Sequence, residues 1–288
     1  MSNSTLWKAL INQGSLSPYP NNASVFKING NSLTSMTITP VEDCVVDFGD
    51  GTTQTFTGNN SSTSVNHSYS ESNIYTIKIT GNHSNFRASR NIIEIIQISD
   101  SVTDCSRMFY NCSSLTAIPE TLIIPNSVTN CSSMFYNCSS LTAIPETFTL
   151  GNSVNSCSQM FNGCSSLTAI PSTLTIPDSV TNCSNMFSGC SSLTTIPKTL
   201  TIPNSVTNCS RMFSSCSSLT SDISNIWPST WNYTGRINIS YMFNSCSKIV
   251  GTVPADKLWN SGKTFNSSSC FTNCTSLTNY NEIPAGWK

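Results

Sequence analysis

A 26-residue repeat constrains this chain more than any other feature. The copy that starts at Ser101 reads SVTDCSRMFYNCSSLTAIPETLIIPN. Four further copies start at Ser127, Ser153, Ser179 and Ser205. Two degraded copies follow, with ISYMFNSCSKIVG from Ile239 and SSSCFTNCTSLTNYNEIP from Ser267. Fixed self-similarity at such a period is typical of a solenoid.

A single repeat of this kind cannot fold alone. Burial of a large apolar side chain contributes roughly 1.5–3 kcal/mol, whereas ordering the backbone costs roughly 1–2 kcal/mol per residue. Stacked repeats cover each other on both sides, so equivalent residues are expected to form columns. One such column holds Phe109, Phe135, Phe161, Phe187, Phe213 and Phe243. The two degraded copies are expected to cap the open end.

The spacing inside a repeat predicts its local structure. Cys131, Met134, Phe135 and Cys138 fall at i, i+3, i+4 and i+7, which predicts one face of a short helical turn. The runs LTAIP and TLTIP alternate and end in proline, so they predict short strands. Residues 100–288 are therefore expected to form a solenoid of about seven repeats, each a helical turn followed by short strands.

The segments MFxxCSSLT, the following IP and IPNSVT resemble BspA-like leucine-rich repeats of bacterial surface proteins. The resemblance covers about residues 100–288. The first cysteine of each copy departs from the usual signature. The resemblance implies a curved solenoid used for adhesion and protein contacts, without fixing a ligand.

The chain contains 14 cysteines, an even number that raises the question of disulfides. Residues seven apart on a helix lie about 10.5 Å apart along its axis, whereas a disulfide needs Cα atoms within about 7 Å. Six intervening residues exceed the usual zinc spacing, and the repeats contain no histidine. The cysteines are predicted to be small core residues that fold in a reducing cytoplasm, with no metal and no cofactor. Disulfides between neighbouring repeats remain the alternative.

Residues 21–99 alternate like β-strands separated by turns, and Asp50-Gly51 is a hairpin signal. The run from Phe48 to Thr52, then His67, Tyr69 and the triplet starting at Tyr75, resembles the PKD domain. That resemblance implies an immunoglobulin-like β-sandwich that serves as a spacer or interaction module, although Ile74 replaces a usual glycine. The predicted fold class is thus mainly β, with a sandwich followed directly by the solenoid through a rigid junction.

Residues 1–20 form a separate segment in which Leu6, Trp7, Leu10 and Ile11 would share one helical face. This face is predicted to dock onto a larger assembly; the alternative is a segment that folds onto its own domain or stays flexible. The short apolar stretch is interrupted by Lys8 and lacks a signal-peptide core.

Charge excludes several classes of partner. Only 9% of the residues are charged and the net charge is −1, so no basic footprint for nucleic acid is present. Ser, Thr and Asn supply about 42% of the residues, a composition that favours a polar, uncharged outer surface. No apolar run is long enough for membrane insertion.

Candidate binding residues are aromatic, because ring faces are common platforms for sugars and partner proteins. The region between the fifth and sixth copies breaks the period and is rich in them. The full candidate set is Trp227, Trp231, Tyr233, Tyr241 and Trp259, with Tyr110 and Tyr136 earlier in the repeats. The alternative is that these rings pack the irregular repeats and the cap.

Catalytic and metal alternatives have less support. Glu120 and Glu146 would lie about 5 Å apart on stacked strands, as in a retaining glycosidase, but their column continues as Ser172 and Lys198. That column indicates a solvated row. Asp47 and Asp50 are too few carboxylates for calcium. His67 and His83 are the only histidines in the sequence, and His67 is expected to be a packed or hydrogen-bonded structural residue instead of a catalyst.

The sequence therefore predicts a non-enzymatic structural or adhesive surface protein. The favoured class is a bacteriophage virion component: a capsid decoration, head-fibre or tail protein. Its expected partners are other virion proteins and a host-surface glycan or protein, and homo-oligomerisation stays open. The alternative is a secreted or surface-anchored bacterial adhesin, and a glycan-active enzyme is the third hypothesis.

Overall fold

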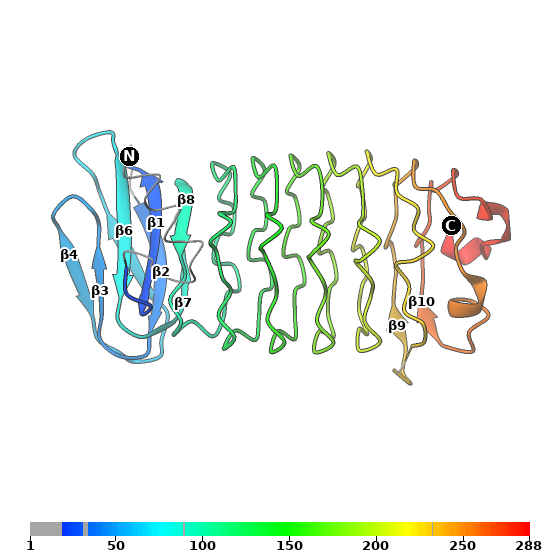
Figure 1. Ribbon diagram of the computed structural model, residues 1–288, viewed down its shortest axis with the longest axis horizontal. Coiled ribbons are helices and arrows are strands. Elements are labelled where there is room, and N and C mark those ends of the chain that lie inside the picture. Colours follow the sequence, from blue (N-terminus) through cyan, green and yellow to red (C-terminus); the bar gives the residue numbers. More distant parts are fainter. Residues whose placement is uncertain (1–18, 31–33, 89, 232) are drawn as a thin grey trace, which may run out of the picture.

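The computed structural model describes residues 19–30, 34–88, 90–231 and 233–288. They form an elongated molecule with β-sheets at one end and a stack of coils along the rest (Figure 1). The predicted segment containing Leu6, Trp7, Leu10 and Ile11 lies outside the described residues. No helix among the described residues is long and apolar enough to cross a membrane.

Two antiparallel sheets make up the N-terminal part. The first has the strand order β4 (Thr53–Phe56), β3 (Cys44–Asp47), β6 (Ile74–Thr80), β1 (Ala23–Asn29) and β8 (Ile92–Gln97). The second has the order β5 (Thr63–His67), β2 (Thr34–Pro40) and β7 (His83–Arg87).

The two sheets pack on each other as the alternating pattern predicts. Met36 and Ile38 of β2 are buried, whereas the residues between and beside them are more exposed. Phe26 of β1 and Phe86 of β7 stack with ring centroids 5.5 Å apart. The Asp50-Gly51 turn joins β3 to β4 as an antiparallel hairpin. The sandwich-like β-region is therefore confirmed.

The repeats contain turns instead of the predicted helix. Residues immediately before the Met-Phe pair, or before its equivalent, have φ between 55° and 58°: Arg107, Ser133, Gln159, Asn185, Arg211, Tyr241 and Ser269. Residues before the second cysteine have φ between 53° and 74°: Asn111, Asn137, Gly163, Gly189, Ser215, Ser245 and Asn273. A right-handed helix cannot pass through left-handed residues. The helical prediction is therefore wrong, although the Cys131, Met134, Phe135 and Cys138 side chains are all buried.

Neighbouring coils are joined by backbone hydrogen bonds. The amides of Cys131, Ser133 and Phe135 donate to carbonyls of the next repeat over distances of 2.8–2.9 Å. The parallel contacts are mostly isolated bridges, such as Ala117 with Ala143, so the predicted strands shrink to single residue pairs. Only β9 (Ile237–Asn238) and β10 (Phe265–Asn266) pair as parallel strands among the described repeats.

A column of phenylalanine rings fills the centre of the stack, as the period predicts. Successive rings from Phe109 to Phe243 are stacked with centroids 5.3–5.6 Å apart. Phe271 extends the column by 6.0 Å at one end, and Phe86 of β7 meets Phe109 edge-on at 6.0 Å at the other. The core therefore runs without interruption from the sandwich through the repeats.

Strand β7 acts as the coil that precedes the first repeat. The Thr103 amide donates to the Ser84 carbonyl at 3.0 Å, and the Ala88 amide donates to the Met108 carbonyl at 2.7 Å. The Asn85 side chain adds a 2.6 Å hydrogen bond to the Asp104 carbonyl. One ladder of backbone contacts thus continues across the junction.

Three short 3-10 helices lie at the far end: η1 (Ala255–Lys257), η2 (Tyr280–Glu282) and η3 (Ala285–Trp287). The Phe271 amide donates to the Trp287 carbonyl at 2.7 Å. Trp287 packs edge-on against Trp259 and Phe265, in each case at 5.6 Å. The C-terminal segment therefore takes the place of a further coil and covers the last one.

Candidate binding surface

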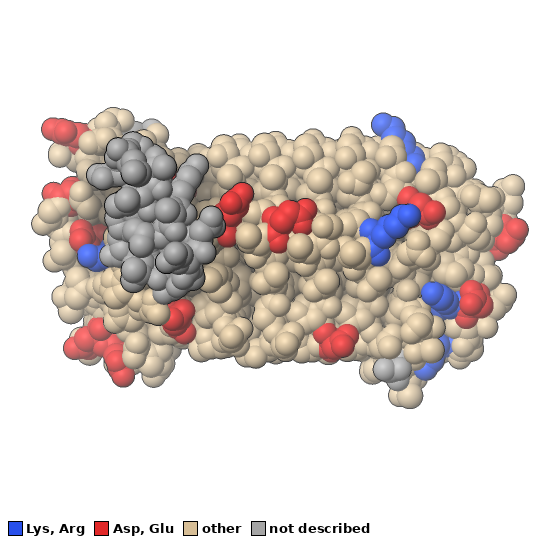
Figure 2. Space-filling view, viewed as in Figure 1, with Lys and Arg blue, Asp and Glu red and all other residues tan. Residues whose placement is uncertain are grey.

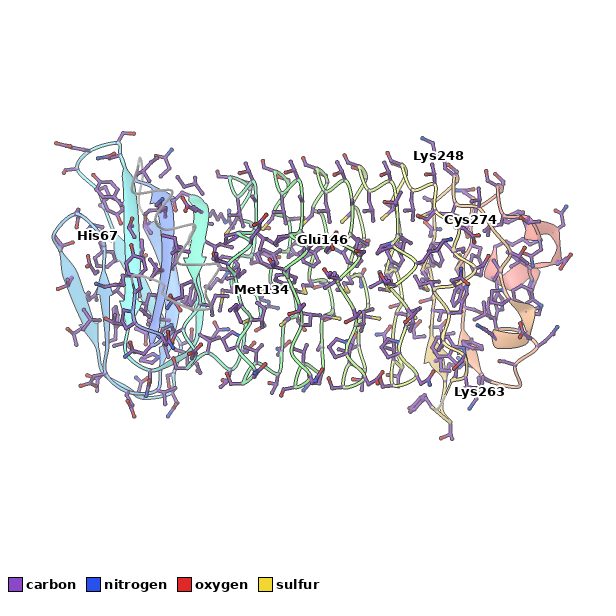
Figure 3. All side chains as sticks on the ribbon, in the orientation of Figure 1. His67, Met134, Glu146, Lys248, Lys263 and Cys274 are labelled. Atoms are coloured by element: carbon purple, nitrogen blue, oxygen red, sulfur yellow. The ribbon has the colours of Figure 1, made fainter. Side chains whose placement is uncertain are left out.

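The cysteines belong to the core. All fourteen are buried, and none of them forms a disulfide. No group of three His, Cys, Asp or Glu side chains in the described part of the chain is arranged to hold a metal. Met134 and Cys274 in Figure 3 illustrate side chains within the stack.

The second cysteine of a repeat makes a regular inter-repeat contact. The Cys138 thiol donates to the Phe109 carbonyl at 3.1 Å, and Cys164 makes the equivalent contact with Phe135 at 3.2 Å. Burial raises the pKa of Cys138 and of Cys190 to about 12. These thiols are therefore protonated at neutral pH and poor nucleophiles.

Phe48, Asp50, His67 and Tyr69 form a compact cluster in the sandwich. The His67 Nε2 atom lies 2.6 Å from Asp50 Oδ2, and the imidazole stacks on Phe48 at 4.1 Å. The Tyr69 hydroxyl donates to the Phe48 carbonyl at 2.9 Å. Burial raises the pKa of Asp50, but hydrogen bonds from Thr52 and His67 outweigh it and lower that pKa to about 2. This aspartate therefore ties the turn to β5.

His83 is also structural. It is fully buried between Ser24, whose Oγ lies 2.8 Å from Nε2, and the Gly81 carbonyl, 2.9 Å from Nδ1. Burial lowers the pKa of His83, so the neutral imidazole is favoured. Both histidines thus make hydrogen-bonding contacts within the sandwich, which for His67 agrees with the structural role expected from the sequence.

Trp227 and Trp231 do not lie on the surface. Their exposed fractions are 2% and 3%. Trp227 packs edge-on against Phe243 and Phe271, whereas Trp231 donates from Nε1 to the Lys257 carbonyl at 2.9 Å. Both residues therefore follow the alternative, in which the indole rings pack the irregular repeats. Neither ring offers a free face for a ligand.

The other aromatic candidates differ in exposure. Tyr233 is 44% exposed, whereas Trp259 is partly buried against Trp287. Tyr110 and Tyr136 are half-buried and stack with centroids 4.6 Å apart and an interplanar angle of 4°. The two rings therefore cover each other's facing surfaces.

Guanidinium groups cover two of these tyrosines. Arg87 lies over Tyr110 at 4.7 Å from the ring centroid, and Arg211 lies over Tyr241 at 4.5 Å. These arginine–tyrosine contacts were missed from the sequence because each pair is separated by more than twenty residues. The only signal for these contacts in the sequence was the 26-residue period, which places equivalent residues of successive repeats in one column.

Glu146 of the glutamate row is hydrogen-bonded to the next repeat. The exposed Glu146 carboxylate accepts hydrogen bonds from Ser172 and Thr173 of that repeat. Loss of hydration raises the pKa of Glu146, but these hydrogen bonds outweigh it and hold that pKa below its ordinary value. The exposure of Glu146 and these contacts favour the interpretation of its row with Glu120 as a solvated one.

Rows of hydroxyl groups run along the outside. The Thr142, Thr168 and Thr194 hydroxyls each donate to the carbonyl of the equivalent residue one repeat earlier, at 3.1–3.3 Å. Charged residues are sparse over the face of the stack that Figure 2 shows, and the exposed Glu146 lies near the middle of the molecule in Figure 3. The surface thus presents ordered, mostly uncharged polar groups.

Comparison with known proteins identifies the repeats. A protein-family model described as "Mycoplasma protein of unknown function, DUF285" matches residues 53–174 and 156–283. No curated protein and no solved structure matches the chain significantly. Since the two matches together span residues 53–283, the chain belongs to the family described as Mycoplasma protein of unknown function, DUF285.

Proposed function

We propose that this protein is a non-enzymatic structural and adhesive protein of a bacteriophage particle, as a capsid decoration, head-fibre or tail protein. The observation that carries this proposal is the uninterrupted core from Phe26 through Phe271. It makes the chain a rod that holds a regular polar surface at a distance from its N-terminal end. Its partners would be other virion proteins and a glycan or protein of the host surface.

The state of the cysteines supports folding in the cytoplasm before the protein reaches the outside of the cell. Fourteen buried cysteines without a disulfide among them suit a reducing cytoplasm better than an oxidising export route. Phage proteins fold in the host cytoplasm and reach the outside on lysis. A phage protein can therefore keep reduced thiols and still contain modules that resemble those of surface proteins.

We further propose the finer fold relationships. The Asp50–His67–Tyr69 cluster supports a PKD-like, immunoglobulin-like sandwich. The coil stack with a buried Met-Phe-Cys-Leu set supports a relationship to BspA-like leucine-rich repeats. Both types of module serve mainly as spacers and interaction surfaces.

The absence of catalysis is part of the proposal. The thiols are buried, and the exposed Glu146 carboxylate accepts hydrogen bonds from its neighbours. A turnover assay on polysaccharides is expected to give no product above background. Release of reducing ends at a rate proportional to protein concentration would contradict this part.

The second candidate is a bacterial surface adhesin. The family description names Mycoplasma, a bacterial genus, and that name favours a cellular location. The same rod and the same polar surface would serve an adhesin equally well. Location therefore separates the two candidates.

Mass spectrometry of purified phage particles and of host envelope fractions tests the choice. Recovery at a fixed ratio to capsid or tail proteins is the expected result. Recovery in the envelope alone would overturn the virion proposal in favour of the adhesin. Recovery in neither fraction would contradict both candidates.

A further inference from the structure

Two neighbouring rows of side chains form what we term the turn edge of the stack. One row is Arg107, Ser133, Gln159, Asn185, Arg211, Tyr241 and Ser269, and the other is Tyr110, Tyr136, Asn162, Ser188, Ser214, Asn244 and Thr272. Within a repeat the rows are joined by a tight turn, as in the 3.1 Å hydrogen bond from the Tyr110 amide to the Arg107 carbonyl. Residues at the two ends of such a turn have Cα atoms within about 7 Å.

The sandwich adds cations to one end of this edge. Arg87 of β7 lies over the Tyr110 ring, and the Ala88–Met108 hydrogen bond brings the end of β7 alongside Arg107. Arg87 and Arg90 both lie close enough to Cys112 to lower its pKa, against the larger opposing effect of burial. Three arginines therefore gather around the first repeat.

Carboxylates are excluded from the turn edge. Neither row contains Asp or Glu in any of the seven copies, although the whole chain has 14 acidic and 13 basic residues. Asp104 is the nearest in sequence, and its carboxylate accepts the Ser106 amide at 2.7 Å. Among the described residues, no carboxylate lies within salt-bridge distance of Arg87, Arg90, Arg107 or Arg211.

Stacking on tyrosine prepares the guanidinium groups for a ligand. A ring beneath the guanidinium face fixes its plane and leaves the in-plane N–H donors available. Those donors match the paired oxygens of sulfate, phosphate or carboxylate groups. The Arg87–Tyr110 and Arg211–Tyr241 contacts repeat this arrangement at two places along the rod.

From these observations we infer that the turn edge binds an anionic polysaccharide that lies along the rod. The inference rests on the proposed surface role and specifies the chemistry of its ligand. Arg87, Arg107 and Arg211 contact the acidic groups, and neutral side chains such as Gln159 and Asn185 face the sugar hydroxyls between them. Tyr110 and Tyr241 position the arginines.

Binding of the purified full chain to immobilised polymers tests the inference. Dextran sulfate, polygalacturonate and a glycerol-phosphate polymer distinguish sulfate, carboxylate and phosphate ligands, and neutral dextran is the control. Binding to at least one anionic polymer, weakening as salt increases, is expected. Failure to bind any of the three would overturn the inference, whereas virion recovery would still decide the proposed function independently.

Two double variants distinguish binding at a defined site from attraction by the overall charge of the protein. Arg107→Gln with Arg211→Gln is expected to weaken binding about tenfold or more, because charge-assisted hydrogen bonds are lost. Gln159 occupies the same row with the same left-handed backbone, so these substitutions suit the fold. Lys198→Gln with Lys263→Gln removes equal charge at two residues that belong to neither row of the turn edge, and Figure 3 shows Lys263 at the lower margin of the molecule. Equal losses in both double variants would contradict a defined site.

Discussion

The second cysteine of each repeat fills a small core position and also links two coils. In all seven copies the position is cysteine: Cys112, Cys138, Cys164, Cys190, Cys216, Cys246 and Cys274. Six of them donate to the carbonyl of a phenylalanine in the preceding coil, at 2.9–3.2 Å. The first cysteine position is less restricted, since Ile239 and Ser267 also occur there.

Cys164→Val is expected to lower the free energy of unfolding by about 1 kcal/mol, because the thiol donor to Phe135 is lost while the apolar volume is kept. Cys157→Val is the matched control, because its thiol lies 3.9 Å from the nearest carbonyl acceptor, that of Asn182. Urea denaturation measures both variants. An equal loss at the two positions would show that shape, and not the hydrogen bond, decides the residue.

At the scale of single residues, the sequence predicted burial well where the period was strict. The Phe column and the cysteines were identified because identical positions must stack. For Trp227 and Trp231 the sequence left both binding and packing open, because a break in the period gives no indication of which side an aromatic ring faces. Their burial is decided by Phe243, Phe271 and the Lys257 carbonyl.

At the scale of the element, the turn around Met-Phe replaces the expected helix. Apolar spacing at i, i+3, i+4 and i+7 cannot distinguish a helix from two consecutive tight turns. Asn or Gly occupies the position before the second cysteine in five copies, and both residues tolerate positive φ. The recurrence of Asn or Gly at this position was the signal in the sequence that indicated turns.

Gly189→Ala is expected to cost about 1 kcal/mol of unfolding free energy, because alanine is disfavoured at φ 74°. Space is not limiting, since the added Cβ would meet only the Gly163 backbone at ordinary contact distance. Gly189→Asn is the control, because asparagine occupies the equivalent position of another repeat, Asn137, with φ 53°. Thermal unfolding should rank glycine first, asparagine second and alanine last; alanine equal to glycine would refute the backbone explanation.

The Asp50–His67 cluster gives the sandwich a defined response to acid. The carboxyl has a lowered pKa in the folded state, about 2 against 3.8, so its stabilising effect is complete above pH 4. It is lost as pH falls from about 4 to about 2. Asp50→Asn should therefore lower the unfolding temperature at pH 5 but make little difference near pH 2.

Thermal scans between pH 2 and pH 5 measure this difference. Asp178→Asn removes a carboxylate on the repeats, outside the cluster, and serves as the control. Its unfolding temperatures are expected to stay parallel to those of the parent protein. A constant difference between the parent and Asp50→Asn down to pH 2 would rule out the carboxylate as its source.

At the scale of the whole molecule, both ends of the stack are covered. Strand β7 covers the first coil, and the segment ending in Trp287 covers the last. Trp287→Ala should speed hydrogen exchange in residues 265–288 and leave residues 21–99 unchanged, because each coil contacts only its neighbours. Tyr233→Ala, at an exposed ring, is the control. Faster exchange in the sandwich as well would show that the molecule unfolds as one cooperative unit.

The sequence by itself determined that the chain stacks. A strict 26-residue period places Phe109, Phe135 and their equivalents in one column, since no single repeat buries enough apolar surface to fold alone. The alternating pattern of residues 21–99 likewise determined the β-sheet region. Both signals are periodic patterns along the chain. They can be recognised without knowing which residues lie next to each other in the folded protein.

Only the tertiary structure decided which side chains reach the surface together. Arg87 meets Tyr110 because β7 serves as the coil before the first repeat, and Arg211 meets Tyr241 because the stack continues through the irregular insertion. Such contacts depend on how coils align in space, across separations of 23 and 30 residues. Local spacing carries no information about that alignment.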